Sequence, residues 1–378
     1  MKRFVLFIIT CISLNCCIAQ QGINNIWLSG YWGGGGQIEF NFYSGSPIIS
    51  FISIPMDFNH THANISDAQG NLLFYTNGYY IADATHNTMM NGFGINPGAY
   101  SNAFPDGHLL PQSTLILKKP DSNNLFYMFH NSMDNYPTLG SYSFQLYLTI
   151  VDMSLNNGKG AVILKNNPVI SDSINTGKIT AVRHANGRDW WVICHRVNST
   201  KYYKILITPS GITSVSFQNI GLYRMWDHGQ AKFSNNGNHF AYYHYFNGLD
   251  IMDFDRCTGM FSNAVSDTSL PYIQGNVGCE FSPNSQFLYV TNILKVYQYD
   301  VTAANILATR TEVAVWDSFA QPGIPNLGAY LCLSQLAPDG KIYITTGNGT
   351  TYMGRLNNPD VAGIACDVAQ HSVLLPTY

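Results

Sequence analysis

The apolar positions of this chain fall in short runs that alternate with polar residues, and a tight turn precedes the clearest of them. Segments 233–242 (FSNNGNHFAY), 281–290 (FSPNSQFLYV) and 336–344 (LAPDGKIYI) share one order: an apolar residue, a small residue, a turn rich in Pro, Asn, Asp or Gly, and an alternating apolar and aromatic run. Such turns favour positive φ angles and local side-chain hydrogen bonds. The runs that follow have the period and composition of strands. Each segment therefore predicts a strand, a turn and a second strand.

The same unit recurs more weakly upstream, at 24–32, 67–78, 121–131 and 184–196. When each unit is anchored at the polar residue that enters its apolar run, successive anchors lie 46 to 64 residues apart. The anchors are Asn25, Asn71, Asn124, Arg188, Asn238, Gln286 and Lys341. Four-stranded propeller blades repeat every ~40–50 residues, so the spacing agrees with one blade per unit.

Further strand-like segments fill the intervals, including 37–43, 145–153 and 295–301, and no long stretch has a helical apolar stripe. A β-sandwich is the competing architecture, but it predicts no fixed period of this length. A ring of four-stranded sheets explains the period and leaves few exposed strand edges. We therefore expect an all-β, seven-bladed β-propeller of four-stranded antiparallel blades over residues 20–378, with an inserted loop at 156–176.

The first residues have the layout of a secretory signal peptide. Lys2 and Arg3 precede the apolar stretch 4–12, and the small residue Ala19 follows. The stretch is shorter than the ~20 residues of a membrane-spanning helix, and no other segment resembles a transmembrane span. We expect a signal peptide over 1–19 with cleavage after Ala19; the alternatives are a buried N-terminal strand and, less favoured, a lipid anchor on Cys16 or Cys17.

The charge balance excludes one class of partner. The chain has 19 basic and 22 acidic residues, a net charge of −3 and no long basic run. Nucleic-acid binding needs a positive surface that neutralises phosphates, so nucleic acid is not an expected partner. The only glutamates are Glu39, Glu280 and Glu312, which makes a pair of catalytic glutamates an unfavoured hypothesis.

Five cysteines remain after Ala19, and no two have the CxxC spacing of a zinc site. An odd number leaves at least one free thiol or an intermolecular bond. Cys257 and Cys279 flank one turn-rich segment, and in an oxidising compartment they are the preferred disulfide. The alternative is that they are buried free thiols that pack as small apolar groups.

His60 and His62 form an HxH pair whose side chains would share one side of a strand. They are weak candidates for metal ligands, because two imidazoles alone do not make a metal site. The simpler interpretation places them among the polar loop residues at the rim of a blade. The four glycines 33–36 lack the Gly-Lys-Ser/Thr continuation of a phosphate loop and predict a flexible turn.

The most distinctive segment is 184–191 (HANGRDWW). In a functional interpretation, His184, Arg188 and Asp189 lie beside an aromatic platform that stacks a sugar or a peptide. In the structural interpretation, which the Asn-Gly turn favours, a hairpin turn leads into a core strand and the two tryptophans pack between blades.

Trp226, Asp227 and His228 precede another unit, where loops of a propeller lead toward one face. The Asp–His pair could orient an imidazole for acid–base chemistry or could join successive blades. The chain lacks the HExxH, GxSxG, SxxK and EF-hand motifs. The sequence therefore predicts no catalytic residue and no cofactor, and these three residues are candidates for binding.

Several segments resemble a known group of proteins. FSPNSQFLYV (281–290) and APDGKIYI (337–344) are similar to repeats of YVTN and TolB-like propellers. With GNLLFYTNG (70–78), HANGRDWW (184–191) and FDRCTG (254–259), they resemble secreted Bacteroidetes propellers that often carry a type IX secretion sorting domain or a gliding-motility-associated C-terminal domain. The resemblance implies a secreted β-propeller. The chain departs from this pattern in that no sorting domain follows residue 374.

Together these features predict a binding or interaction scaffold that is secreted or held at the outer cell surface, with a glycan or a protein as its partner. The loops at the two ends of a propeller commonly carry recognition. The alternative is an extracellular lyase or hydrolase, for which ionisable residues would converge at the channel mouth. Its candidates are His60, His62, His184, Arg188, Asp227 and His228. A third hypothesis is the front half of a longer adhesin or motility protein.

Overall fold

The computed structural model describes residues 24–30, 36–136, 140–226 and 228–377. The predicted signal peptide (1–19) and the binding candidate Asp227 lie outside the described residues. In the described ranges, no helix is long and apolar enough to cross a membrane.

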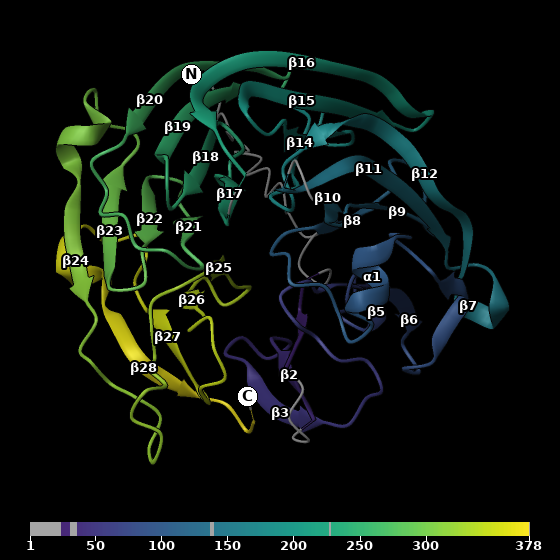
Figure 1. Cartoon of the computed structure of the whole chain (residues 1–378), viewed down its shortest axis with the longest axis horizontal. Helices are drawn as coiled ribbons and strands as arrows, with labels where there is room; N and C mark the ends of the chain where they lie inside the picture. The colour runs from purple at the N-terminus through teal and green to yellow at the C-terminus, as the bar shows by residue number, and fades with distance from the viewer. Residues whose placement is uncertain (1–23, 31–35, 137–139, 227, 378) are drawn as a thin grey trace, which may run out of the picture.

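The chain folds into successive antiparallel meanders arranged in a ring (Figure 1). The first meander has strands β1 (Ile26–Ser29), β2 (Gln37–Asn41) and β3 (Ile48–Ile52). The second has β4 (Ala63–Ser66), β5 (Leu72–Thr76), β6 (Tyr80–Asp83) and β7 (Thr88–Phe93). The third has β8 (Thr114–Lys118), β9 (Leu125–His130), β11 (Gly140–Asp152) and β12 (Ala161–Ile174), and the short strand β10 (Asp134–Tyr136) pairs with β11.

The remaining meanders have four strands each. The fourth has β13 (Thr180–Arg183), β14 (Trp190–His195), β15 (Ser199–Thr208) and β16 (Gly211–Arg224). The fifth has β17 (Gly229–Phe233), β18 (His239–His244), β19 (Gly248–Asp255) and β20 (Met260–Asp267). The sixth has β21 (Gly278–Phe281), β22 (Phe287–Thr291), β23 (Lys295–Asp300) and β24 (Thr311–Val315). The seventh has β25 (Ser334–Leu336), β26 (Ile342–Ile344), β27 (Tyr352–Leu356) and β28 (Val368–Leu374).

Helical structure among the described residues is limited to short segments: α1 (Ala99–Ala103), η2 (Asn156–Gly158), η3 (Ile306–Thr309) and η4 (Gly363–Cys366). The second and third meanders touch through one parallel pair, Ala161 with Met90, and every other strand pairing between named strands is antiparallel. The all-β propeller fold is thus confirmed. Seven blades stay a prediction, because the first meander shows three strands rather than four.

The prediction of an inserted loop at 156–176 is wrong. Most of this segment is strand β12, which has 14 residues and pairs with β11, which has 13. The register between them shifts near Pro168, where a proline removes a backbone donor from the ladder. The long interval in the repeat therefore comes from two extended outer strands and not from a loop.

The repeat seen in the sequence corresponds to a repeated turn between the first and second strands of a meander. A backbone N–H bonds to the carbonyl three residues earlier, and the donor residue has a positive φ. The pairs, donor first, are Gly70 with Asp67, Gly187 with His184, Gly237 with Ser234, Ser285 with Ser282 and Gly340 with Ala337. Local sequence is sufficient for such turns, which explains why they were predictable.

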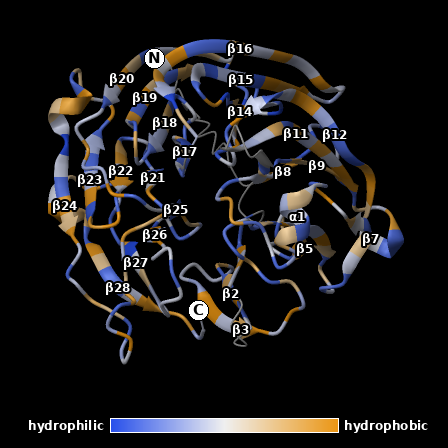
Figure 2. Cartoon of the chain, viewed as in Figure 1, coloured by the Kyte–Doolittle hydropathy of each residue, from blue (hydrophilic) through white to orange (hydrophobic). Residues whose placement is uncertain are grey.

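The core lies between neighbouring meanders. The second strand β22 is buried along its whole length and is mostly apolar (Figure 2). The second strand β18 is buried at all but its first residue, although it also carries tyrosines and histidines. In one interface, Tyr243 and Leu249 of the fifth meander pack with Leu288 and Val290 of the sixth. Because each meander buries apolar side chains against two neighbours, the sheets form a continuous ring.

The first and last meanders close the ring through aromatic side chains. Phe40 of β2, Phe42 just after β2 and Trp27 of β1 pack around Tyr343 of β26. The ring centroid of Trp27 lies 5.9 Å from that of Tyr343, in an edge-to-face arrangement. The C-terminus lies beside this first meander (Figure 1).

The first strand of each meander lies near the axis and the last lies at the rim (Figure 1). We call one end of the ring the entry face; it comprises the loops that lead into each first strand and the turns between second and third strands. The turn face is the opposite end, where first and second strands connect. The longest loops, at 94–113 and 316–333, lead into first strands, whereas the turns between first and second strands are short.

Candidate functional site

The entry face contains a cavity of about 710 Å³, the axial cavity. Its lining comes from loops that lead into β4, β8, β17, β21 and β25, and from two turns of the sixth and seventh meanders. Since the first strands of these five meanders surround the axis, the cavity lies over the mouth of the central channel. Its volume is in the range of ordinary small-ligand sites.

The lining residues occupy one recurring position in the repeat. His60, His228, Asn276 and Cys332 each lie one to three residues before the first strand of a meander. Because these strands start around the axis, the residue that enters each strand is directed toward the same space. The fold therefore brings together side chains that are far apart in sequence.

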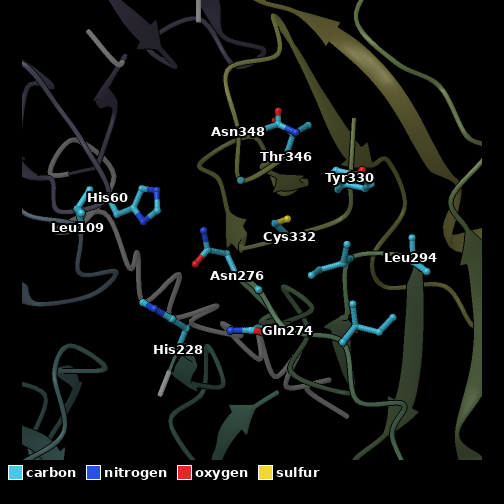
Figure 3. Close-up of a pocket in the computed structure, with 14 residues that line it drawn as sticks. His60, Leu109, His228, Gln274, Asn276, Leu294, Tyr330, Cys332, Thr346 and Asn348 are labelled. Carbon is cyan, nitrogen blue, oxygen red and sulfur yellow. The ribbon is translucent and has the colours of Figure 1, made fainter. Parts of the chain in front are cut away.

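Three lining side chains carry polar atoms that are not used within the protein. The amides of Gln274 and Asn276 make no hydrogen bond to another described residue, and His60 Nδ1 is buried without a described partner. Figure 3 shows these residues and His228 around a common space. The arrangement offers a ligand both donors and acceptors.

Burial makes the imidazoles of the cavity neutral. Desolvation lowers the pKa of His60, and it lowers the pKa of His228 to about 4, with smaller contributions from the charges of Lys178 and His60. Desolvation also raises the pKa of the Cys332 thiol to about 12. At neutral pH the described lining therefore holds no charge, because it contains no Asp, Glu, Lys or Arg.

Two glutamines cross-link the first strands. Gln230 of β17 donates from Nε2 to the carbonyl of Ser334 (2.8 Å) and accepts from the backbone N–H of Cys279 (3.0 Å). Gln112 donates to the carbonyl of Ala231 (3.0 Å) and accepts from its N–H (2.9 Å). These bonds join strands of different meanders and make the axial region rigid.

A buried polar cluster lies behind His228. Lys178 is 3% exposed and donates from Nζ to Asn175 Oδ1 (3.4 Å). Asn175 in turn donates to the hydroxyl of Tyr242 (2.9 Å). Lys178 is not part of the described cavity lining.

The predicted candidates of the entry face have different environments. His60 lines the cavity, whereas His62 is exposed, with its ring 6.4 Å from that of Phe58. Both lie in the loop before β4 and not on a strand. The described residues hold no group of three or more His, Cys, Asp or Glu positioned for a metal ion. Trp226 lies beside His228, with ring centroids 6.2 Å apart.

His184, Arg188 and Asp189 lie on the turn face, at the other end of β13 from the cavity. Arg188 Nε donates to Asp189 Oδ1 at 2.8 Å, and the turn closes at Gly187, whose φ is +73°. The structure therefore does not bring His184 and Arg188 together with His60 and His228. The convergence expected for the enzyme hypothesis does not occur for these residues.

The two tryptophans of the same segment join neighbouring meanders. Trp190 Nε1 donates to the carbonyl of Lys118 (3.1 Å) in the third meander, and Trp191 Nε1 donates to the carbonyl of Arg256 (3.0 Å) in the fifth. The guanidinium of Arg183 lies 3.6 Å from the centroid of the Trp190 ring. Both rings thus have structural partners.

The predicted disulfide between Cys257 and Cys279 is wrong, because both residues are free thiols. Cys257 is exposed in the turn between β19 and β20, near His184, whose Nε2 lies 3.0 Å from its carbonyl. Cys279 is buried in β21, where its thiol lies 3.5 Å from the carbonyl of Gln230. Cys257 lies in a turn between the third and fourth strands of the fifth meander, whereas Cys279 lies in the first strand of the sixth.

The sequence did not indicate Gln274 and Asn276, whose side-chain amides line the cavity and make no hydrogen bond to another described residue. Neither belongs to a motif, and both lie in a loop with ordinary polar composition. One signal could have found them: their position just before the strand that begins a repeat unit, which is shared by the predicted candidate His228.

Comparisons with solved structures agree on the fold. A candidate 6-phosphogluconolactonase from Bacteroides uniformis is similar, with 12% sequence identity, 94% of this chain and 97% of that chain covered, and a TM-score of 0.50. A second candidate 6-phosphogluconolactonase, from Bacteroides fragilis, has 11% identity and a TM-score of 0.49, with 94% of this chain and 96% of that chain covered. The Dos1 propeller has 11% identity and a TM-score of 0.46, with 87% of this chain and 91% of that chain covered. No family model and no curated protein matches the chain. At 12% identity the first similarity shows the β-propeller fold alone.

Proposed function

We propose that this β-propeller is a binding module that takes an uncharged, hydroxyl-rich ligand, a glycan, in the axial cavity. The observation that carries the proposal is the combination of a neutral described lining with the unused amides of Gln274 and Asn276. Amides and neutral imidazoles both donate and accept hydrogen bonds, as the hydroxyls of a sugar do. A glycan can therefore satisfy these groups without leaving a buried charge unpaired.

The charge of the lining argues against an anionic ligand. A phosphate or carboxylate that leaves water needs a cation or several donors in compensation. Lys178, whose charge contributes to the lowered pKa of His228, is buried and bonded to Asn175. The geometry of the described cavity thus favours a neutral sugar over a sugar phosphate.

The lyase or hydrolase alternative lacks support from the described lining. General acid–base catalysis works best with a group that titrates near the operating pH. The pKa of His228 is lowered to about 4, the pKa of Cys332 is raised to about 12, and no carboxylate lines the described cavity. We therefore propose binding without chemical turnover.

The location is part of the same proposal. The basic, apolar and small-residue pattern of 1–19 supports export, and a glycan ligand suits a protein at the outer surface or outside the cell. Expression in a bacterial host, followed by N-terminal sequencing of the mature product, tests it. A mature chain that begins at Gln20 supports export, and retention of residues 1–19 on the folded protein contradicts it.

Binding is tested on purified residues 20–378 with a glycan array, followed by calorimetry on the sugars that bind. Replacing Asn276 by Ala removes one amide from the cavity and should weaken binding by about 1 kcal/mol, or roughly fivefold. The matched control is Gln69→Ala, an exposed amide on the turn face. No binding to any neutral glycan, or equal loss in both variants, would contradict the proposal.

A further inference from the structure

Beside the axial cavity, three aromatic rings form a surface that we call the aromatic ledge: Tyr245, Phe246 and Tyr272. Tyr245 and Phe246 lie in the turn between β18 and β19, and Tyr272 lies in the loop between β20 and β21. Phe246 and Tyr272 are 55% and 59% exposed. Their ring centroids are 5.7 Å apart at an interplanar angle of 90°, and Tyr272 lies 5.6 Å from Tyr245.

The ledge and the cavity share a loop. Tyr272 directly precedes Ile273 and Gln274, which line the cavity, so segment 268–277 contributes to both surfaces. Both the loop and the β18–β19 turn belong to the entry face. The chain itself therefore places the ledge next to the amide of Gln274.

Each ring of the ledge contacts another aromatic ring. Tyr245 stacks on the buried imidazole of His244, with centroids 5.7 Å apart, and it packs against the core of the fifth and sixth meanders. Phe246 and Tyr272 then support each other edge to face. Phe246 and Tyr272 remain more than half exposed, so a ligand can cover their rings.

Exposed aromatic rings beside an uncharged polar cavity fit one class of ligand. The C–H face of a pyranose is apolar and lies flat on an aromatic ring, while its hydroxyl groups bond to amides. The three ledge residues and the described cavity lining are all uncharged at neutral pH. This combination matches a neutral sugar chain longer than one unit.

We infer that the aromatic ledge is a second subsite, and that the ligand is a neutral oligosaccharide with one unit in the axial cavity and a neighbouring unit stacked on Tyr272 and Phe246. The inference rests on the proposed glycan-binding function and adds the length of the ligand. It requires affinity to rise with chain length, because only a ligand of two or more units reaches both surfaces.

The test is calorimetry on residues 20–378 with malto-, cello-, xylo- and manno-oligosaccharides of one to six units. For the series that binds, affinity should rise by about tenfold from one unit to the longer chains. The double variant Phe246→Ala/Tyr272→Ala should remove this gain and keep the affinity for the single unit. Tyr272→Phe, which retains the ring face, should keep the gain.

The control variant is Tyr43→Ala, which removes a tyrosine that is 77% exposed on the first meander. Thermal melts identify any variant that fails to fold, in which case Tyr272→Ala alone replaces the double variant. Two results overturn the second subsite: equal affinity for all chain lengths, or a gain of affinity with length that survives the loss of both rings. The cavity proposal still stands in either case if Asn276→Ala weakens binding. Binding of no oligosaccharide, or capture of an unglycosylated peptide instead, overturns both.

Discussion

Arg224 and Asp250 form an ion pair with a 2.7 Å separation between Nη2 and Oδ2, and neither side chain has any exposed surface. Arg224 ends β16 and Asp250 lies in β19, so the pair joins the fourth and fifth meanders. Arg224 also donates to the carbonyl of Gly248 (2.9 Å), and Asp250 accepts from the N–H of Leu222 (3.0 Å). These bonds satisfy most of the polar atoms that burial removes from water.

Breaking this pair should destabilise the protein strongly. Arg224→Met leaves the carboxylate of Asp250 buried without its cation, and the free energy of unfolding should fall by about 3–5 kcal/mol. The measurement is guanidinium denaturation followed by tryptophan fluorescence. Lys295→Met removes an ion pair with Glu312 in which both side chains are at least a third exposed, and it should cost less than about 1 kcal/mol. Similar losses in the two variants would show that burial does not govern the contribution of the pair.

Acid should destabilise the fold through buried neutral histidines. Desolvation lowers the pKa of His108 to about 4, of His130 to about 3 and of His244 to about 2. In the unfolded chain histidine titrates near pH 6.5. Between that pH and about 4 the unfolded state binds protons that the folded state does not, so the free energy of unfolding decreases as the pH falls through this window.

For each such histidine, the free energy of unfolding should fall by as much as about 1.4 kcal/mol for each pH unit of acidification. Denaturation at intervals from pH 8 to pH 4.5 measures it. His130→Gln removes one titrating group and should flatten the pH dependence, although it lowers stability at pH 8 because His130 lies within hydrogen-bond distance of Asn96 and Thr149. An unchanged slope in that variant would contradict the assignment.

Closure of the ring should depend on the aromatic contact between the first and last meanders. Phe40→Ala removes a buried ring from the cluster around Tyr343 and should cost about 3–4 kcal/mol. Hydrogen exchange should rise in β1–β3 and β25–β28, while β18 stays protected, because the loss affects one interface of the ring. A uniform rise of hydrogen exchange across all meanders would mean that the interface between the first and last meanders does not open independently of the rest of the ring.

The thiols should differ sharply in reactivity. Cys257 is exposed, whereas Cys194, Cys279, Cys332 and Cys366 are buried. Desolvation raises the pKa of Cys194 and Cys332 to about 12, which further suppresses the reactive thiolate. Ellman's reagent should label one thiol in the folded protein and all five after denaturation. Cys257→Ser should abolish the fast reaction, and a disulfide between Cys257 and Cys279 in the intact protein would contradict the structure.

Local sequence was sufficient for the strands and the turns of the repeat. The turn at Gly340 and the turn at Gly237 follow from short-range preferences, since a positive φ is accessible to glycine at little cost. The apolar run of β22 likewise reports burial on both faces. These features depend on residues within a few positions of one another, and the all-β propeller prediction was confirmed for that reason.

Pairings between distant segments were not accessible in the same way. The apolar stretch 161–164 could belong to a loop or to a strand until β11 was available as its partner. The preference for a Cys257–Cys279 bond over free thiols reflected the same lack of distance information. His184 and His228 both looked functional in sequence, yet they lie at opposite ends of the ring, because one follows a first strand and the other precedes one.

The sequence by itself determined a repeated strand–turn–strand unit and hence the propeller, because period, turn chemistry and strand composition are local properties. Tertiary structure alone decided where the cavity lies, that Gln274 and Asn276 leave their amides unused in it, and that its imidazoles are neutral. These depend on loops from five meanders meeting over the axis and on the loss of water that follows. Neither can be read from any one segment, because burial and approach are properties of the closed ring.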